Sequence, residues 1–171
     1  ADERGRIVTE MTCLPFSDED VGVITAAVAQ SHDADILRKG LPEGVVLEDW
    51  TDRIHCFIVT GPKARDLLAS ITEGDLTLPW LSVQYFAKVA GKDVALVRVS
   101  FAGELGWEVH CDRGDAAHIY DALLAGGAKP FGMKALNSLR IEKGYRAWKG
   151  DLSTDYSLLE GGLERFIDWT H

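Results

Sequence analysis

The chain has 171 residues, of which 46% are hydrophobic and 26% charged, an ordinary globular composition that excludes a disordered or low-complexity protein. This length fits a single domain or the middle of a larger protein. Its 18 basic and 27 acidic side chains leave a net charge of −9, which repels a phosphate backbone and excludes nucleic acid as the main partner. No apolar run reaches the roughly 18–20 residues of a membrane-spanning helix, so no membrane role is expected.

The predicted elements alternate between strands and helices along the chain. Short apolar stretches bounded by turn residues predict strands at residues 6–13, 21–25, 45–50, 53–59, 84–90, 93–101 and 107–111. Apolar residues at helical spacing predict helices at about residues 25–40, 61–71, 115–124 and 134–143. Gly91-Lys92 predicts a tight hairpin. We therefore expect an α+β fold in which antiparallel sheets carry helices on one face.

The cysteines and histidines are scattered. Cys13, Cys56 and Cys111 are far apart, and no cysteine or histidine pair has the spacing of a zinc motif. We expect no metal site, and we expect the thiols to be buried and reduced, as is usual in the cytoplasm.

One segment departs from the acidic character of the chain. Residues 134–149 hold five basic side chains and one acidic side chain. This surplus suits a small anionic ligand or an acidic partner. A solvated helix face balanced by acidic neighbours explains it equally well.

Two runs are specific enough to indicate a family. The first extends from Arg98 to Glu108 and contains Gly103-Glu104-Leu105-Gly106-Trp107-Glu108, and the second extends from Leu136 to Trp148. With the segments from Gly61 to Leu68 and from Gly5 to Glu10, they closely resemble the aminomethyltransferase family, the folate-binding T-protein of glycine cleavage. The nearest variety is the one fused to sarcosine and dimethylglycine dehydrogenases.

The resemblance covers about residues 5–165, and it implies a domain organisation. Members of the family are three-domain proteins arranged around a central folate, with ferredoxin-like elements in the folate-binding part. Residues 1–171 would then be the central folate-binding domain, without the family's first strands and its C-terminal barrel. No dinucleotide fingerprint is present, so any flavin would belong to a fused or partner domain. The missing domains of this architecture are then expected partners.

The resemblance also assigns a role to Glu108. A strand through this residue places Trp107 and Val109 on one face and Glu108 and His110 on the other. A solvated strand carboxylate is the ordinary interpretation. In the family, however, the matching glutamate binds the pterin ring, and a carboxylate can accept paired hydrogen bonds from a ring N–H and an adjacent amine.

Three further residues are expected to line the folate site through the same resemblance. Arg140 matches an arginine in the folate cavity, and its planar guanidinium suits an anionic or carbonyl-bearing ligand. A surface ion pair with Glu142 or another acidic neighbour is the alternative. Tyr145 would shape the same wall. Phe101 stands where the family usually has tyrosine. It can stack against a pterin, but it lacks the hydroxyl that could form a hydrogen bond with the ligand.

Glu10 marks a departure from the family. It occupies the position of the catalytic aspartate, which is thought to position the folate amine or to handle its proton. Glutamate keeps the charge but moves it by about one methylene, and a displacement near 1 Å can lower a rate about 10²-fold. Glu10 is therefore the predicted catalytic residue, with a folate-binding protein that lacks this transfer as the alternative.

The leading hypothesis is a tetrahydrofolate-binding domain for one-carbon transfer, in which a small amine or methyl donor supplies an aminomethyl or methylene group. A folate-dependent demethylase remains open because of Glu10. A non-catalytic folate-binding regulator is the rival, although the Lys-Gly-Cys-Tyr-x-Gly-Gln-Glu signature of that branch does not occur. A structural module whose site has decayed is a third possibility.

Overall fold

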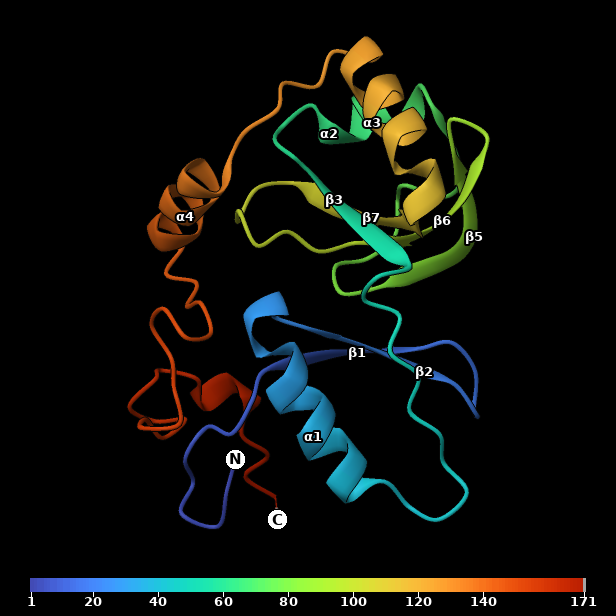
Figure 1. Cartoon of the computed structure of the whole chain (residues 1–171). Helices are drawn as coiled ribbons and strands as arrows, with labels where there is room; N and C mark the ends of the chain where they lie inside the picture. Colours follow the sequence, from blue (N-terminus) through green and yellow to red (C-terminus); the bar gives the residue numbers. More distant parts are fainter. Residues whose placement is uncertain (171) are drawn as a thin grey trace. The chain divides into compact units, whose positions relative to one another are not determined.

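A computed structural model describes residues 1–170 of the chain (Figure 1). The chain divides into two compact units. The terminal unit joins Ala1–Glu48 to the segment that begins at Arg146, and the sheet unit is Asp49–Tyr145. Each unit has its own antiparallel sheet and helices, so the predicted α+β class is confirmed.

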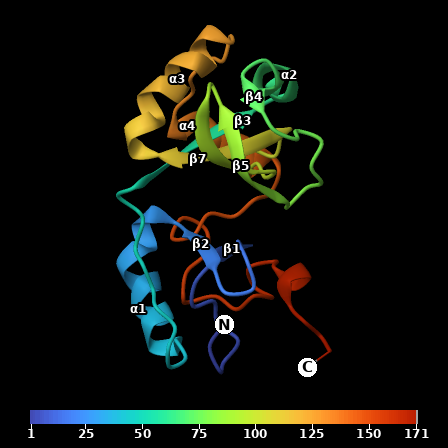
Figure 2. The same ribbon diagram turned by 90° about the vertical axis from the view of Figure 1, so that its right-hand side faces the viewer.

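The terminal unit is built from both ends of the chain. Its strands β1 (Met11–Pro15) and β2 (Val21–Thr25) form an antiparallel hairpin, and a short 3-10 turn leads into α1 (Gln30–Gly40). The late part of the chain packs against the early part (Figure 2), and an isolated β-bridge joins Arg6 to Ser157. A small core joins residues that are distant in sequence: Ile7, Ala29, Trp148 and Leu152.

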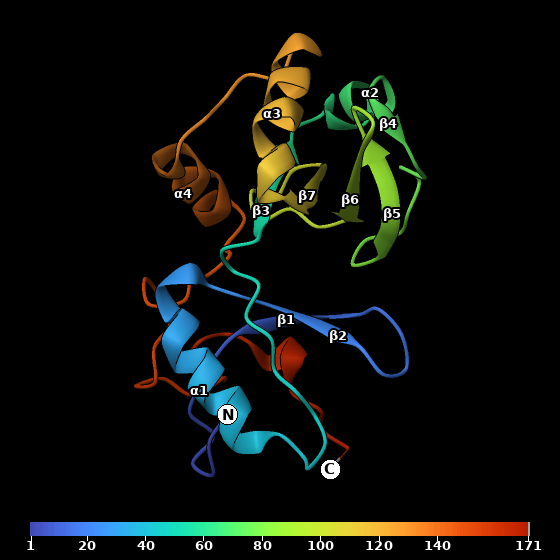
Figure 3. The ribbon, with the colours of Figure 1, turned by 45° about the vertical axis from the view of Figure 1, so that its right-hand side comes forward.

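The sheet unit contains a five-stranded antiparallel sheet in the order β3-β7-β6-β5-β4 (Figure 3). The strands are β3 (Ile54–Thr60), β4 (Thr72–Glu73), β5 (Val83–Val89), β6 (Lys92–Val97) and β7 (Gly106–Asp112). The helices are α2 (Ala64–Ala69), α3 (Ala116–Ala125) and α4 (Met133–Glu142).

One face of this sheet forms the main core. Alternate strand residues point toward α2 and α3, which contribute Leu68, Ile119 and Leu123, and all three side chains are buried. Their strand partners in the core include Val59, Val94, Leu96, Trp107, Val109 and Cys111. The prediction of helices on one face is correct for α2 and α3. The side chains on the opposite face of β3, β6 and β7 lie outside this core.

Some predicted boundaries are wrong, and each has a local cause. The strand expected at residues 6–13 begins only at Met11, because Arg6 makes an isolated bridge and the residues between them join no ladder. Residues 45–50 have no strand partner and form no strand. The strand expected at 93–101 ends at Val97, where the chain turns into the corner that precedes β7.

Within the described part of the chain, no helix combines the length and the apolar composition that crossing a lipid bilayer requires.

Candidate functional site

Strand β7 holds Glu108 on the face away from the core. Trp107 and Val109 are fully buried among core residues, so Glu108 and His110 project to the other side of the sheet. The side chain of Glu108 is 20% exposed. It is therefore a half-buried carboxylate on a regular strand, at the place where the sequence alternation predicts it.

Two other polar side chains meet Glu108 on this face. His110 Nε2 lies 3.0 Å from Glu108 Oε2 and 3.7 Å from Cys56 Sγ. Cys56 stands directly opposite His110 in the β3–β7 register. Although Cys56 is exposed as a residue, desolvation raises the pKa of its thiol well above its usual range, and the charges of Glu108 and Cys111 add to the rise. The thiol is thus protonated at neutral pH, which makes it a weak nucleophile.

A tight corner fixes the start of β7. Arg98 Nη1 donates a hydrogen bond to Gly106 O at 2.9 Å, and the hydroxyls of Thr60 and Ser100 lie 3.0 Å apart. A Cβ added at Gly106 would lie 3.0 Å from the backbone oxygen of Val59, so only glycine fits without displacement. Because the strand start is held from several sides, the backbone position from which Glu108 projects is well defined.

Replacing Gly103 with alanine is expected to destabilise the protein by about 2 kcal/mol. Gly103 sits in the same corner with φ +75°, and an added Cβ would collide with the side chain of Lys143 just after α4. Backbone strain and the collision both act against the variant. Urea unfolding followed by circular dichroism measures the loss.

Gly144→Ala is the matched control, because Gly144 has φ +71° and an added Cβ there meets nothing within 4 Å. It is expected to lose only about 1 kcal/mol, from backbone strain alone. Equal losses for the two variants would show that the contact between Gly103 and Lys143 contributes nothing.

Phe101, Tyr145 and Arg140 come together beside this corner. The rings of Phe101 and Tyr145 stack with centroids 6.2 Å apart and an angle of 17° between their planes. Arg140 Nη1 donates to Tyr145 O at 2.8 Å, and its Nε and Nη2 donate to Asn137 Oδ1 at 2.9 and 2.5 Å. Arg140 is only 6% exposed, so the alternative of an exposed surface arginine is wrong. The structure thus brings three of the four predicted binding residues into one group.

The pockets of the sheet unit include two with different linings. The larger, of 640 Å³, is lined mainly by apolar residues of β3, α3 and the segment between α3 and α4. The smaller, of 340 Å³, is polar and includes Arg98, Ser100 and Tyr145. Neither lining contains Glu108 or Arg140, so the structure does not bring these two charged groups into one of these hollows.

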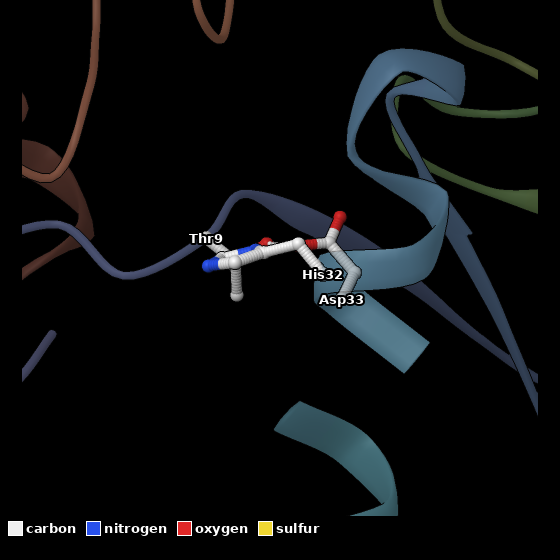
Figure 4. A network of polar contacts seen from close by, with 3 residues as sticks. All are labelled: Thr9, His32 and Asp33. Carbon is white, nitrogen blue, oxygen red and sulfur yellow. Dashed lines mark hydrogen bonds and ion pairs between the residues drawn. The ribbon is translucent and has the colours of Figure 1, made fainter. Parts of the chain in front are cut away.

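Glu10 belongs to the terminal unit, in the segment just before β1. The preceding residue, Thr9, donates its hydroxyl to Asp33 Oδ1 at 2.6 Å, and His32 Nδ1 lies 2.9 Å from the same oxygen (Figure 4). Asp33 is 1% exposed, and its Oδ2 has no hydrogen-bond partner among residues 1–170. These contacts tie the backbone beside Glu10 to helix α1. Glu10 itself is exposed.

Replacing Glu10 with glutamine is expected to stabilise the protein slightly at neutral pH. Although Glu10 is exposed as a residue, nearby protein atoms partly desolvate its carboxyl and raise its pKa above the ordinary value of 4.5, so folding disfavours the ionised form. The penalty is present above the folded pKa and disappears as the pH falls below 4.5. The gain stays below about 1 kcal/mol because solvent screens an exposed carboxylate.

Urea unfolding of both proteins at neutral pH and near pH ~4 measures this difference. A gain for the glutamine variant that persists unchanged at the lower pH would contradict the assignment.

Comparison with known proteins identifies the family. The family model described as "GCVT N-terminal domain" matches residues 1–171. The chain belongs to the GCVT family. This confirms the resemblance to aminomethyltransferases that the sequence motifs indicate.

Relatives of two kinds match this GCVT domain. Mouse mitochondrial dimethylglycine dehydrogenase is 33% identical over 96% of this chain and 20% of its own length. Mouse mitochondrial sarcosine dehydrogenase is 40% identical over 68% of this chain and 13% of its length. The aminomethyltransferase of Thermus thermophilus is 32% identical over 90% of this chain and 44% of its length. The chain thus spans less than half of each of these relatives.

Sequence reasoning missed two pairs of side chains, one in each unit. The contact between Cys56 and His110 joins residues of different strands, and only the β3–β7 register reveals it. The bond from Thr9 to Asp33 joins a loop to a helix. Neither pair has a local spacing motif that could have indicated it.

Proposed function

We propose that this GCVT domain binds tetrahydrofolate and takes part in transfer of an aminomethyl or methylene group. The observation that carries the proposal is the half-buried Glu108 carboxylate, held on a fixed strand within the motif that defines the resemblance. Membership of a family that includes aminomethyltransferases supports it.

The residues present fit a pterin. Glu108 Oε2 faces His110, and the carboxylate has several acceptor positions in all, which leaves capacity for a ring N–H and an adjacent amine. The Phe101–Tyr145 pair supplies flat aromatic surface, which suits a heteroaromatic ring. The hydrogen bonds of Arg140 to Asn137 and Tyr145 hold this aromatic pair in place.

The contribution of the protein in this proposal is positioning and electrostatics. Tetrahydrofolate supplies the nucleophilic nitrogen that accepts the one-carbon group. Glu108 orients the pterin, and the aromatic pair limits its tilt. Arg140 is a permanent cation, so it favours a negatively charged ligand group beside the Phe101–Tyr145 pair. Glu10, in the terminal unit, keeps the negative charge of the family aspartate, and its proposed role in proton handling rests on the resemblance alone. The donor is a small amine or methyl compound.

Calorimetric titration of the purified, chelator-treated protein with tetrahydrofolate tests the proposal. Glu108→Gln keeps the shape of the side chain but removes its charge, and it is expected to weaken binding about 100-fold, because charge-assisted hydrogen bonds contribute about 1.5–3 kcal/mol each. Glu73→Gln is the matched control, since Glu73 is an exposed carboxylate on the far edge strand β4. Its affinity should equal that of the parent.

The outcomes separate the alternatives. Absence of tetrahydrofolate binding by the parent, or equal binding by the Glu108 variant, would reject the proposal. Binding without formation of methylene- or methyl-folate from any amine or methyl donor would instead favour the non-catalytic regulator. Transfer from an oxygen- or sulfur-linked methyl donor would favour the demethylase.

A further inference from the structure

We infer that Cys56, His110 and Glu108 form a binding site for a thiophilic divalent cation such as Zn²⁺. Among residues 1–170, this is the one group of three cysteine, histidine or acidic residues whose ligand atoms converge, and these atoms lie within 4.8 Å of one another. Sulfur, imidazole nitrogen and carboxylate oxygen are the donors that zinc takes in proteins.

Two of the three distances between ligand atoms already approach those of a tetrahedral zinc site. A zinc ion at ~2.3 Å from sulfur and ~2.0–2.1 Å from nitrogen holds these two atoms about 3.6 Å apart, and a nitrogen and an oxygen about 3.4 Å apart. In the structure, Cys56 Sγ and His110 Nε2 are 3.7 Å apart, and His110 Nε2 and Glu108 Oε2 are 3.0 Å apart. The third pair, Cys56 Sγ and the Glu108 carboxylate, lies within 4.8 Å, and a tetrahedral site would hold these atoms about 3.6 Å apart. Side-chain movements of up to about 1 Å would therefore complete the site.

The same geometry argues against a catalytic triad of cysteine, histidine and glutamate. Such a triad uses both ring nitrogens of the histidine, one for the nucleophile and one for the carboxylate. Here a single atom, His110 Nε2, faces both Cys56 and Glu108. One nitrogen cannot donate to the carboxylate and accept from the thiol at the same time. A cation at the point where the three atoms converge displaces the thiol proton of Cys56 to solvent and coordinates all three atoms, so that metal binding releases a proton.

The supporting backbone is rigid, and one coordination position stays accessible. Cys56 and His110 are register partners on adjacent antiparallel strands, and Glu108 is two residues along β7. The side chains of His110 and Glu108 are 14% and 20% exposed, and Cys56 is exposed. Solvent therefore reaches the site. Three protein ligands leave the fourth position of a tetrahedron for water or another small ligand.

This site has a consequence that rests on the proposed function. The cation would take the Glu108 carboxylate, which is the group proposed to bind the pterin. Zinc and tetrahydrofolate should therefore compete, so that the cation inhibits folate binding.

Metal titration of the chelator-treated protein tests the site without any activity assay. Calorimetry should show one Zn²⁺ per chain, and Co²⁺ should give a near-ultraviolet sulfur-to-cobalt band. Cys56→Ser should abolish this band and weaken zinc binding more than about 100-fold. Loss of a residue that only hydrogen-bonds to a metal ligand weakens metal binding less, by about 10–100-fold. Cys13→Ser is the control, because Cys13 is an exposed cysteine of the terminal unit. Binding that is unchanged by Cys56→Ser, or a parent protein without the cobalt band, would overturn the inference.

Titration with tetrahydrofolate in the presence of zinc then tests the competition. Saturating zinc should weaken folate binding at least about 10-fold in the parent and in Cys13→Ser, but not in Cys56→Ser. Equal folate affinity with and without bound zinc would overturn the competition. Failure of the parent to bind folate at all would reject the proposed function, while the metal titration alone still decides the cation site.

Discussion

Trp107→Ala is expected to destabilise the protein by about 3–5 kcal/mol, the largest loss among the substitutions considered. Trp107 is 0% exposed and lies in the core between the sheet and its helices. The guanidinium groups of Arg98 and Arg65 lie 4.6 and 5.6 Å from its ring centre. Truncation therefore leaves a large cavity and removes two cation–π contacts. Urea unfolding followed by circular dichroism measures the change.

Trp107→Phe separates packing from hydrogen bonding. The indole Nε1 of Trp107 has no hydrogen-bond partner among residues 1–170, so replacing the indole removes no bond that the structure supplies. The phenylalanine variant should lose only about 1–2 kcal/mol, because an aromatic ring still fills most of the space. A phenylalanine variant as unstable as the alanine variant would contradict this account.

Local patterns predict much of the fold, because strands and helices leave periodic signatures. The strand at Val21–Thr25, the hairpin around Gly91 and helices α3 and α4 lie within a residue or so of their predicted bounds. The predicted strand boundaries near the N-terminus are wrong where long-range pairing determines the structure. Residues near Arg6 are held by Ser157, which is far away in sequence and carries no local signal.

The candidate site also has parts that local sequence patterns predict and parts that depend on long-range pairing. The alternation along β7 predicts which face Glu108 occupies, since it depends only on neighbouring residues. The partnership of Glu108 and His110 with Cys56 depends on β3 pairing with β7, which are not consecutive strands of the sheet unit. The burial of Arg140 likewise depends on the chain turning back after α4, so that Tyr145 can accept its hydrogen bond. Such long-range contacts cannot be derived from a single sequence.

Arg140→Leu is expected to destabilise the protein by about 2–3 kcal/mol and to weaken tetrahydrofolate binding at least about 10-fold. The guanidinium is buried, and it holds both the side chain of Asn137 and the carbonyl of Tyr145. Leucine fills the apolar space but leaves that carbonyl without its charged donor. The stacked ring of Tyr145 then loses its anchor, and Phe101 loses its neighbour.

Two controls decide whether the geometry of Arg140 or only its charge matters. Lys134→Leu removes an exposed cation from the same helix and should leave stability within about 0.5 kcal/mol of the parent. Arg140→Lys keeps the charge but lacks the planar fork that reaches Asn137 and Tyr145 together, so it should recover less than half of the lost stability. Full recovery by lysine would show that the charge alone matters. Equal losses of stability for the two leucine variants would show that the hydrogen bonds of Arg140 do not stabilise this part of the structure. Another interaction would then have to hold the Phe101–Tyr145 pair in place.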